Sequence, residues 1–212
     1  MGSTWVMNDE SLPEYRNMLL QMETGLKWVN ETFGVHPRVA WQIDPFGNSA
    51  VSPAIFSSLG YDSIILNRVG TTLAHDLEEA SASEFIWSAA PVESGQTNQL
   101  FAHALALSRY QAPVEFKYQP ANFPFWIHPQ ADCSVNSLEA NYKACMQLYW
   151  REVIKPTLQG TKHHKVFSIF GDDFAFKNAD YSFKYLDKFI EVFEDHAEEV
   201  YNRTIKFKFA TV

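Results

Sequence analysis

The chain has 212 residues, of which 46% are hydrophobic and 15% aromatic, and its formal net charge is −8 at pH 7. This length and composition predict a globular chain with a sizeable hydrophobic core. The acidic balance argues against nucleic acid or an anionic membrane as a partner, since either would need a basic surface, and no apolar run approaches the roughly 20 residues that span a bilayer.

Helices and short strands are predicted to alternate in the first half of the chain. Apolar residues that recur every three or four positions predict a helix over 13–33, which Gly34 and Pro37 would end. The elements expected next are a strand at 38–43, a helix at 52–59, a strand at 63–66, a charged helix at 71–82 and a strand at 84–87.

The second half is less regular. Its expected elements are a polar loop at 88–99, a strand at 100–107, a helix from Ser137 that Pro156 closes, a strand at 165–170, a helix at 181–201 and the start of a strand at 205–209. Between the strand at 100–107 and Ser137 lies a long stretch rich in proline and aromatic residues. Such a loop usually covers or lines a site, although a packed loop that serves only the fold is nearly as common.

No repeat or linker divides the sequence, so we expect a single domain over residues 1–212. The alternation of strands and helices predicts an α/β fold, in which a parallel sheet carries helices on both faces. Parallel strands end at one edge of their sheet, so residues that follow them can converge there. Three predicted strands end in charged residues: Asp44, Arg68, and the pair Asp172 and Asp173.

Two carboxylates and an arginine at one edge suit retaining glycoside hydrolysis. One carboxylate attacks the anomeric carbon, the other protonates the leaving oxygen and later activates water, and the two lie about 5–5.5 Å apart. Asp172 could raise the pKa of Asp173 by like-charge repulsion, as the acid requires. From the residues alone, each Asp could instead cap a loop or form a salt bridge, and Arg68 could belong to a structural ion pair.

The string Trp-Gln-Ile-Asp-Pro-Phe-Gly at 41–47 resembles the signature of the family 38 glycoside hydrolases, the class II α-mannosidases. Further strings that resemble family segments, in the family order, lie at 5–10, 64–68, 84–87 and 170–174. The sequence is therefore identified as similar to the N-terminal catalytic domain of the lysosomal or Golgi enzymes. The resemblance implies an incomplete, β/α-barrel-like domain that is truncated at both ends.

By this resemblance Asp44 is the catalytic nucleophile and a zinc ligand, and Asp173 is the acid/base. Asp172 contacts sugar hydroxyls or supports its neighbour, Arg68 lies beside the nucleophile, and Tyr110 falls near a tyrosine of the family's pocket. The implied reaction is hydrolysis of terminal α-D-mannosyl residues with retention. Mannose-containing oligosaccharides or glycoproteins, such as N-glycans, are the implied substrates, and the lysosome or secretory pathway is the implied location.

By the resemblance, the family's zinc site also needs a His-x-Asp pair on a first strand, expected before Trp5, and a histidine expected beyond residue 212, and neither region is part of this sequence. We therefore expect zinc in the complete family enzyme but not in this chain alone, because one carboxylate does not hold zinc against water. Other segments of the same mannosidase would be required as partners. Asn48 stands where the family usually has His. Because this residue is a neighbour of the nucleophile, the difference concerns the surroundings of Asp44 more than zinc binding.

Cys133 and Cys145 are too few for a disulfide scaffold and too far apart for a Cys-x-x-Cys pair, so we expect buried free thiols, with one disulfide as the alternative. Asn-x-Thr sequons at 30–32 and 202–204 favour a secretory route.

Two other functions compete with the enzyme. The chain could be a non-catalytic carbohydrate-binding or structural remnant of an α-mannosidase. It could also be a deacetylase-like metal hydrolase, but that enzyme needs a His pair near an Asp, and the sequence shows no such spacing. If the enzyme interpretation is right, we expect Asp44, Arg68 and Asp173 to face one cleft.

Overall fold

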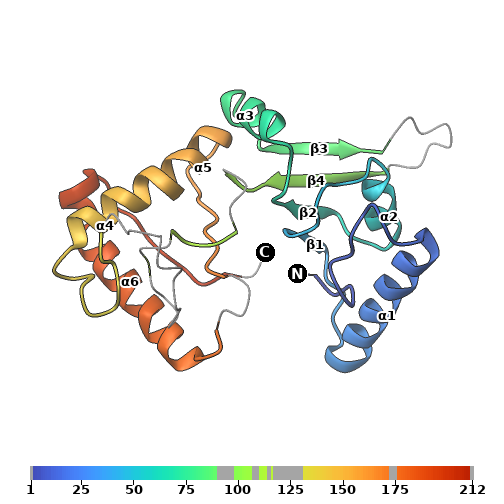
Figure 1. Ribbon diagram of the computed structural model, residues 1–212, viewed down its shortest axis with the longest axis horizontal. Helices are drawn as coiled ribbons and strands as arrows, with labels where there is room; N and C mark the ends of the chain where they lie inside the picture. Colours follow the sequence, from blue (N-terminus) through green and yellow to red (C-terminus); the bar gives the residue numbers. More distant parts are fainter. Residues whose placement is uncertain are drawn as a thin grey trace. The chain divides into compact units, whose positions relative to one another are not determined.

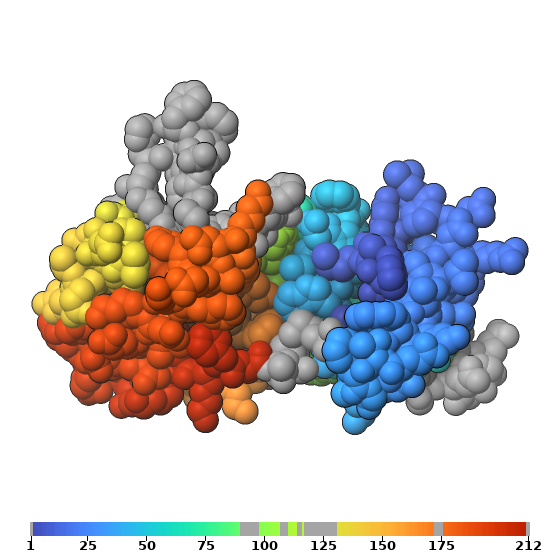
Figure 2. Space-filling model, turned by 90° about the horizontal axis from the view of Figure 1, so that it is seen from below, coloured from blue at the N-terminus to red at the C-terminus, as the bar shows by residue number. Residues whose placement is uncertain are grey.

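The computed structural model describes residues 2–89, 98–106, 110–113, 116, 131–171 and 176–210 (Figure 1). Figure 2 shows these residues in colour from a second side. The chain forms two compact units: a sheet unit of Met1–Arg109 with Gln159–His164, and a helical unit of Tyr110–Leu158 with Lys165–Ala210. That residues 1–212 act as a single domain stays a prediction.

The sheet unit is built on a four-stranded sheet in the order β1-β2-β4-β3. The strands are β1 (Val39–Gln42), β2 (Ser63–Leu66), β3 (Glu84–Ser88) and β4 (Gln99–Ala104). The strands β1, β2 and β4 are parallel, with Ala40 beside Ile64 and Ile64 beside Ala102. The α/β fold predicted from the sequence is confirmed, as are the four predicted strands of this half.

The strand β3 corrects the expectation of a wholly parallel sheet, because it runs antiparallel to β4 with Glu84 beside His103. Residues 89–98 connect the two strands, whereas a parallel crossover takes about a dozen residues or more and usually a helix. The two strands therefore form a hairpin, in which the Ala89 N–H donates to the Asn98 carbonyl at 3.1 Å.

Helices α1 (Tyr15–Phe33) and α2 (Ser52–Ser58) pack on one face of the sheet (Figure 1). Alternate strand residues point to this face. The shared buried cluster comprises Met22, Leu26, Ile55, Phe56, Ala40, Ile64, Leu66, Leu100 and Ala102. The apolar spacing predicted for 13–33 is thus the buried stripe of α1, and the helix ends, as predicted, at Gly34 with φ 65°.

The opposite face of the sheet is less evenly covered. Ile65 and His103 are buried there, but Ile86 is 63% and Phe101 42% exposed. Helix α3 (Thr71–Glu79) has no buried residue, as its charged sequence suggested.

The N-terminal segment lies against the sheet unit at two places. The Gly2 N–H donates to the Val39 carbonyl of the edge strand β1 at 2.9 Å, and the Trp5 N–H donates to the Gln21 carbonyl of α1 at 3.3 Å. Helix α1 has a glycine, Gly25, at this point, and a Cβ there would collide with the backbone of Ser3 to Trp5. The absence of a side chain at Gly25 therefore permits the close approach.

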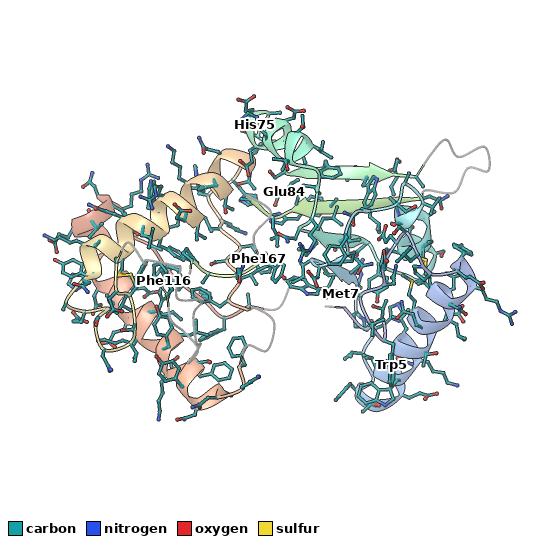
Figure 3. All side chains as sticks on the ribbon, viewed as in Figure 1. Trp5, Met7, His75, Glu84, Phe116 and Phe167 are labelled. Carbon is teal, nitrogen blue, oxygen red and sulfur yellow. A yellow bond between two sulfur atoms is a disulfide. The ribbon has the colours of Figure 1, made fainter. Side chains whose placement is uncertain are left out.

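The helical unit contains α4 (Tyr142–Tyr149), a π-helical turn η2 (Trp150–Ile154), most of α5 (Lys155–Gly160) and α6 (Ala179–Tyr201). Phe116 lies between α4 and α6 (Figure 3), with its ring centroid 5.4 Å from that of Tyr149 and 5.8 Å from that of Phe189. In the part of the chain that the structure describes, no helix combines the length and apolarity needed to cross a membrane.

The helix expected from Ser137 to Pro156 has different ends. It starts at Tyr142, and the chain stays helical past Pro156 to Gly160. Pro156 is the second residue of α5, directly after the π-helical turn η2. Pro156 lacks an N–H and cannot donate to a carbonyl of the preceding turn, and the π-helical turn directly before it, where the Lys155 N–H donates to the Trp150 carbonyl, accommodates it within a continuous helix.

The strands expected at 165–170 and 205–209 are wrong, since these described residues pair with no strand. Apolar residues of both segments pack against the helical core instead, among them Phe170 and Phe207. The Phe207 N–H donates to the Glu194 carboxylate of α6 at 2.7 Å. The apolar residues that predicted strands are here half-buried by contact with helices.

The two cysteines correct the expectation of free thiols. Cys133 and Cys145 form a disulfide, with their Cα atoms 5.7 Å apart, and both residues are buried. The bridge joins the start of α4 to the segment before it. The Tyr185 hydroxyl of α6 donates to the Cys133 carbonyl at 2.8 Å, which links the same segment to α6.

Replacing both cysteines by alanine should lower the free energy of unfolding by about 3 kcal/mol, because the bridge closes a loop with a sequence separation of 12. Urea unfolding followed by tryptophan fluorescence measures this change. Reductant should bring the wild-type protein to the same midpoint and leave the variant unaffected. A wild-type midpoint that ignores reductant would show that the cysteines are not paired in solution.

Candidate functional site

Asp44 and Arg68 lie at the same edge of the sheet. Asp44 follows β1 after the buried Ile43, and Arg68 follows β2 after the buried Asn67. Because β1 and β2 are parallel neighbours in register, their carboxyl ends leave the sheet side by side. The Nε and Nη2 atoms of Arg68 donate to Asp44 Oδ1 at 2.9 and 2.5 Å. The structure thus brings together two residues that are 24 positions apart in the sequence.

The Asp44–Arg68 pair is open to solvent on one side, with 38% of the Asp44 side chain and 39% of the Arg68 side chain exposed. The Arg68 guanidinium also lies over the Phe46 ring, 4.7 Å from its centroid, and Phe46 is itself 78% exposed. An arginine held by a carboxylate and an aromatic face has a restricted position. The site therefore offers a carboxylate, a fixed cation and an exposed aromatic ring to solvent.

Asn48, in the loop after Asp44, makes a further contact at the same edge of the sheet. Its Nδ2 donates to the Arg68 carbonyl at 3.3 Å. Asn48 thereby ties this loop to the backbone of the residue that pairs with Asp44. The sequence marked Asn48 only as a departure from the family, and this contact gives it a structural role.

Glu10 is the residue at this edge to which the sequence analysis gave no role. Its Oε2 accepts hydrogen bonds from the Ser49 N–H and from the Ser52 hydroxyl, the latter at 2.6 Å. Burial raises the pKa of the Glu10 carboxyl, against the opposing effect of these two hydrogen bonds. Glu10 lies 39 and 42 positions before its partners, so no local pattern in the sequence could show the contact.

Among the remaining predicted site residues, Tyr110 lies in the helical unit. Tyr110 is half-buried, and its carbonyl oxygen lies 4.0 Å from the place that a Cβ on Gly171 would take. The backbone of Tyr110 is therefore close to the residue that precedes Asp172. Asp172 and Asp173 themselves lie outside the described residues. Their distance from Asp44, and a cleft that holds all three, stay predictions.

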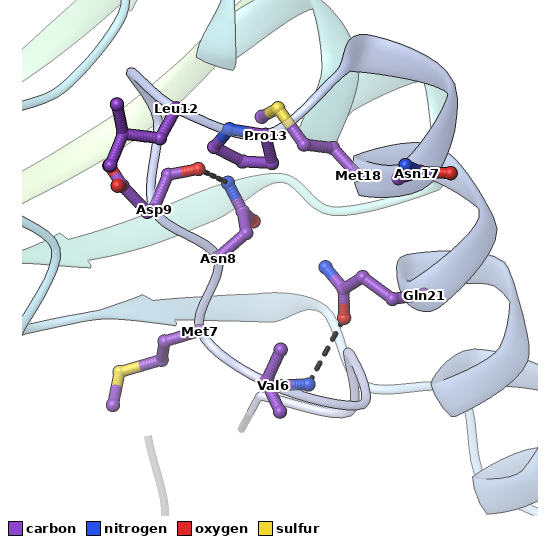
Figure 4. A pocket seen from close by; sticks show the side chains of 9 residues that line it. All are labelled: Val6, Met7, Asn8, Asp9, Leu12, Pro13, Asn17, Met18 and Gln21. Atoms are coloured by element: carbon purple, nitrogen blue, oxygen red, sulfur yellow. Dashed lines mark hydrogen bonds between the residues drawn. The ribbon is translucent and has the colours of Figure 1, made fainter.

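A hollow of about 500 Å³ lies elsewhere in the sheet unit, between the N-terminal segment and α1 (Figure 4). Its lining includes Asp9, Asn17 and Gln21, and the Val6 N–H donates to Gln21 Oε1 at 3.0 Å. Neither Asp44 nor Arg68 lines this hollow. The hollow and the Asp44–Arg68 pair are separate features.

The described residues do not fit a zinc site. Among them, no three His, Cys, Asp or Glu side chains are grouped so that they could hold a metal ion. Asp44 is the one zinc ligand that the family resemblance assigns to the described residues, and one carboxylate does not hold zinc against water.

Comparison with known proteins places the chain among glycosidases. The sequence profile described as "Glycosyl hydrolases family 38 N-terminal domain" matches residues 1–212. Alpha-mannosidase F of Dictyostelium discoideum is 31% identical over 186 residues, which are 88% of this chain and 17% of the relative. Lysosomal alpha-mannosidase of Bos taurus is 32% identical over 195 residues, 89% of this chain and 18% of the relative.

Epididymis-specific alpha-mannosidase of Homo sapiens is 26% identical over 205 residues, 92% of this chain and 20% of the relative. This chain thus spans between 17% and 20% of the length of these three relatives.

The Asp44–Arg68 pair should show measurable coupling in a double-mutant cycle of Asp44→Asn and Arg68→Gln. We expect a coupling free energy of about 0.5–1 kcal/mol, near the upper end for exposed pairs, because Arg68 donates twice and also stacks on Phe46. Urea unfolding of the four proteins gives the value.

The more exposed Arg38–Asp62 pair is the reference for this cycle, with 74% and 49% of its side chains exposed. Its coupling should be smaller. A coupling near zero between Asp44 and Arg68 would show that Arg68 does not hold Asp44 in solution.

Glu10 should make stability depend on pH. Because its folded pKa lies above 4.5, its contribution to the free energy of unfolding is fully present below pH 4.5 and is lost as the pH rises through the folded pKa. Glutamine does not titrate, so the stability of the wild-type protein relative to Glu10→Gln should fall with rising pH. Urea unfolding between about pH 4 and 7 measures this difference.

The exposed Glu14 supplies the control for this titration, through Glu14→Gln. It makes the same chemical change at an exposed carboxyl of the same segment. A wild-type advantage over Glu10→Gln that grows with pH would contradict the raised pKa.

Proposed function

The chain belongs to family 38 of the glycosyl hydrolases, and we propose that it supplies the nucleophile of an α-mannosidase that hydrolyses terminal α-D-mannosyl residues with retention. The observation that carries this proposal is the Asp44–Arg68 pair at the common edge of β1 and β2. The α-mannosidase names of the relatives support the choice of sugar.

In the first step of the proposed reaction, a carboxylate oxygen of Asp44 forms a bond to the anomeric carbon while the glycosidic carbon–oxygen bond breaks. Asp173, in its acid form, gives its proton to the departing oxygen. Asp172 contacts sugar hydroxyls or supports Asp173, and Tyr110 contributes to the sugar pocket. The product of this step is a covalent mannosyl-enzyme.

In the second step the Asp173 carboxylate takes a proton from water, and the water oxygen attacks the anomeric carbon. The bond to Asp44 breaks, and the Asp44 carboxylate is restored. Two displacements at the same carbon return its original configuration, so the released mannose retains its anomeric form.

Arg68 and Phe46 have supporting roles in this scheme. The two hydrogen bonds from Arg68 to one Asp44 oxygen fix the rotation of the carboxylate, and attack requires a nucleophile held close to its line of approach. The exposed Phe46 ring offers an apolar face on which the C–H side of a sugar can stack.

Zinc belongs to the proposal as a property of the complete enzyme. Asp44 would be one ligand there, other segments of the mannosidase would provide the rest, and zinc would orient the sugar hydroxyls and stabilise developing charge.

We propose N-glycans and other oligomannose glycoconjugates as the natural substrates, and the lysosome or another compartment of the secretory pathway as the location. The Cys133–Cys145 disulfide supports this location, because disulfides persist in oxidising compartments. A lysosomal relative supports it as well.

The proposal is tested with a complete α-mannosidase that carries this sequence. It should hydrolyse an aryl α-mannoside, and nuclear magnetic resonance of the first product should show retention. Asp44→Asn should lower kcat by about 10³-fold or more without unfolding the protein, because an amide cannot attack the anomeric carbon.

Asp62→Asn is the matched control, because it makes the same chemical change at an exposed Asp that pairs with Arg38 rather than Arg68. It should leave kcat close to the wild-type value. Turnover that survives in Asp44→Asn would remove Asp44 from the mechanism. A folded protein that binds mannosides but never hydrolyses them would favour the non-catalytic carbohydrate-binding remnant.

A further inference from the structure

The loop between β1 and α2, residues 43–51, carries Asp44 but has little regular structure of its own. Its short backbone hydrogen bonds join Gly47 to Pro45 and Ser52 to Ser49, each at 3.0 Å. Both span only two or three residues, so they bend the loop without attaching it to the rest of the protein. Contacts from other segments must therefore fix its position.

One such contact comes from Glu10. A single carboxylate oxygen, Oε2, accepts both the Ser49 N–H in the loop and the Ser52 hydroxyl at the first residue of α2. A carboxylate that accepts two donors forms stronger hydrogen bonds than a neutral acceptor does. Glu10 thus holds the far end of the loop and the start of α2 together.

Glu10 is in turn held by β1. The Gln42 Nε2 of β1 donates to Asn8 Oδ1 at 3.3 Å, and both side chains are buried, with 2% of Gln42 and 6% of Asn8 exposed. Asp9 Oδ1 accepts the Ser11 N–H at 3.0 Å, which forms a tight turn on the other side of Glu10. The Glu10 side chain therefore projects from a segment with a defined position.

These contacts form a closed circuit around Asp44. It runs from Gln42, two residues before Asp44, through Asn8 and Glu10 to Ser49, five residues after Asp44. A loop attached on both sides of a residue cannot shift without breaking one of the attachments. The loop that carries Asp44 is thus attached, through Ser49, to the Glu10 carboxylate.

We propose that Glu10 is a positioning residue for Asp44: its carboxylate fixes the loop that carries the nucleophile. This inference rests on the proposed function of Asp44. Glu10 itself contacts no reacting atom in the proposed mechanism. Its effect passes through Ser49 and Ser52 to the backbone of the loop.

The test uses the complete α-mannosidase with Glu10→Ala, Glu10→Gln and the control Glu14→Gln. An aryl α-mannoside gives kcat and KM, and hydrogen exchange gives the protection of the Ser49 amide. Glu10→Ala should lower kcat about 10–100-fold with little change in KM, since a small displacement of a catalytic group costs up to about 10²-fold. The Ser49 amide should exchange at least about tenfold faster, because it loses its acceptor.

Glu10→Gln keeps one acceptor oxygen, so both effects should be intermediate, and Glu14→Gln should behave as wild type. A kcat for Glu10→Ala that is unchanged, or that falls only with the folded fraction measured by circular dichroism, would overturn the proposal. A rise in KM alone would also overturn it.

If the wild-type protein has no turnover, the proposed function fails separately, and Ser49 exchange still decides the structural part. Exchange that is unchanged in Glu10→Ala would then reject Glu10 as the anchor of the loop, whereas faster exchange would support it.

Discussion

The parallel pairing of β1 with β2 is the constraint on which the candidate site depends. The register puts Gln42 beside Leu66, so the two strands end at the same level of the sheet. Asp44 follows one strand and Arg68 follows the other, so a carboxylate and a guanidinium meet there. A slip of one residue would turn alternate side chains to the other face of the sheet and separate Ala40 and Ile64 from α1 and α2. The apolar cluster under the sheet therefore determines the register, and the register determines which charged groups meet.

The polar edge and the apolar core are linked through single residues. Gln42 is a strand residue with a buried side chain, and its amide reaches Asn8 at the start of the circuit that includes Glu10. Burying polar groups is unfavourable unless they form hydrogen bonds, so these groups order the segments that satisfy them. Packing positions the strands, while buried hydrogen bonds position the loop that follows them.

The fold was predictable where a local pattern had one physical cause. The spacing over 13–33 and the short apolar run at 63–66 gave α1 and β2 because burial on one face of a helix, or inside a sheet, leaves a distinct period. Prediction failed where the same sequence pattern is compatible with two different kinds of packing. The apolar run at 165–170 packs against helices and not within a sheet, and the antiparallel β3 follows from a connection too short for a crossover, a criterion that the sequence already contained.

For the candidate site, strand ends and family strings gave Asp44 and Arg68, whose contact the structure shows, while Asp172 and Asp173 stay predictions. The contacts of Glu10 could not be predicted, because hydrogen bonds between residues 39 or more positions apart produce no pattern in a single sequence.

Gly25 of α1 is a residue distant in sequence from Asp44 that still affects the segment carrying Glu10. A glycine inside a helix weakens it by roughly 1 kcal/mol relative to alanine, so alanine at this position would ordinarily be an improvement for α1. Here any larger residue would push away the backbone of Ser3 to Trp5, the start of the segment that leads to Glu10. Alanine at this position would therefore favour the helix while it disturbs the segment packed against it. Protein engineers who stabilise helices by removing glycine would need to exempt it.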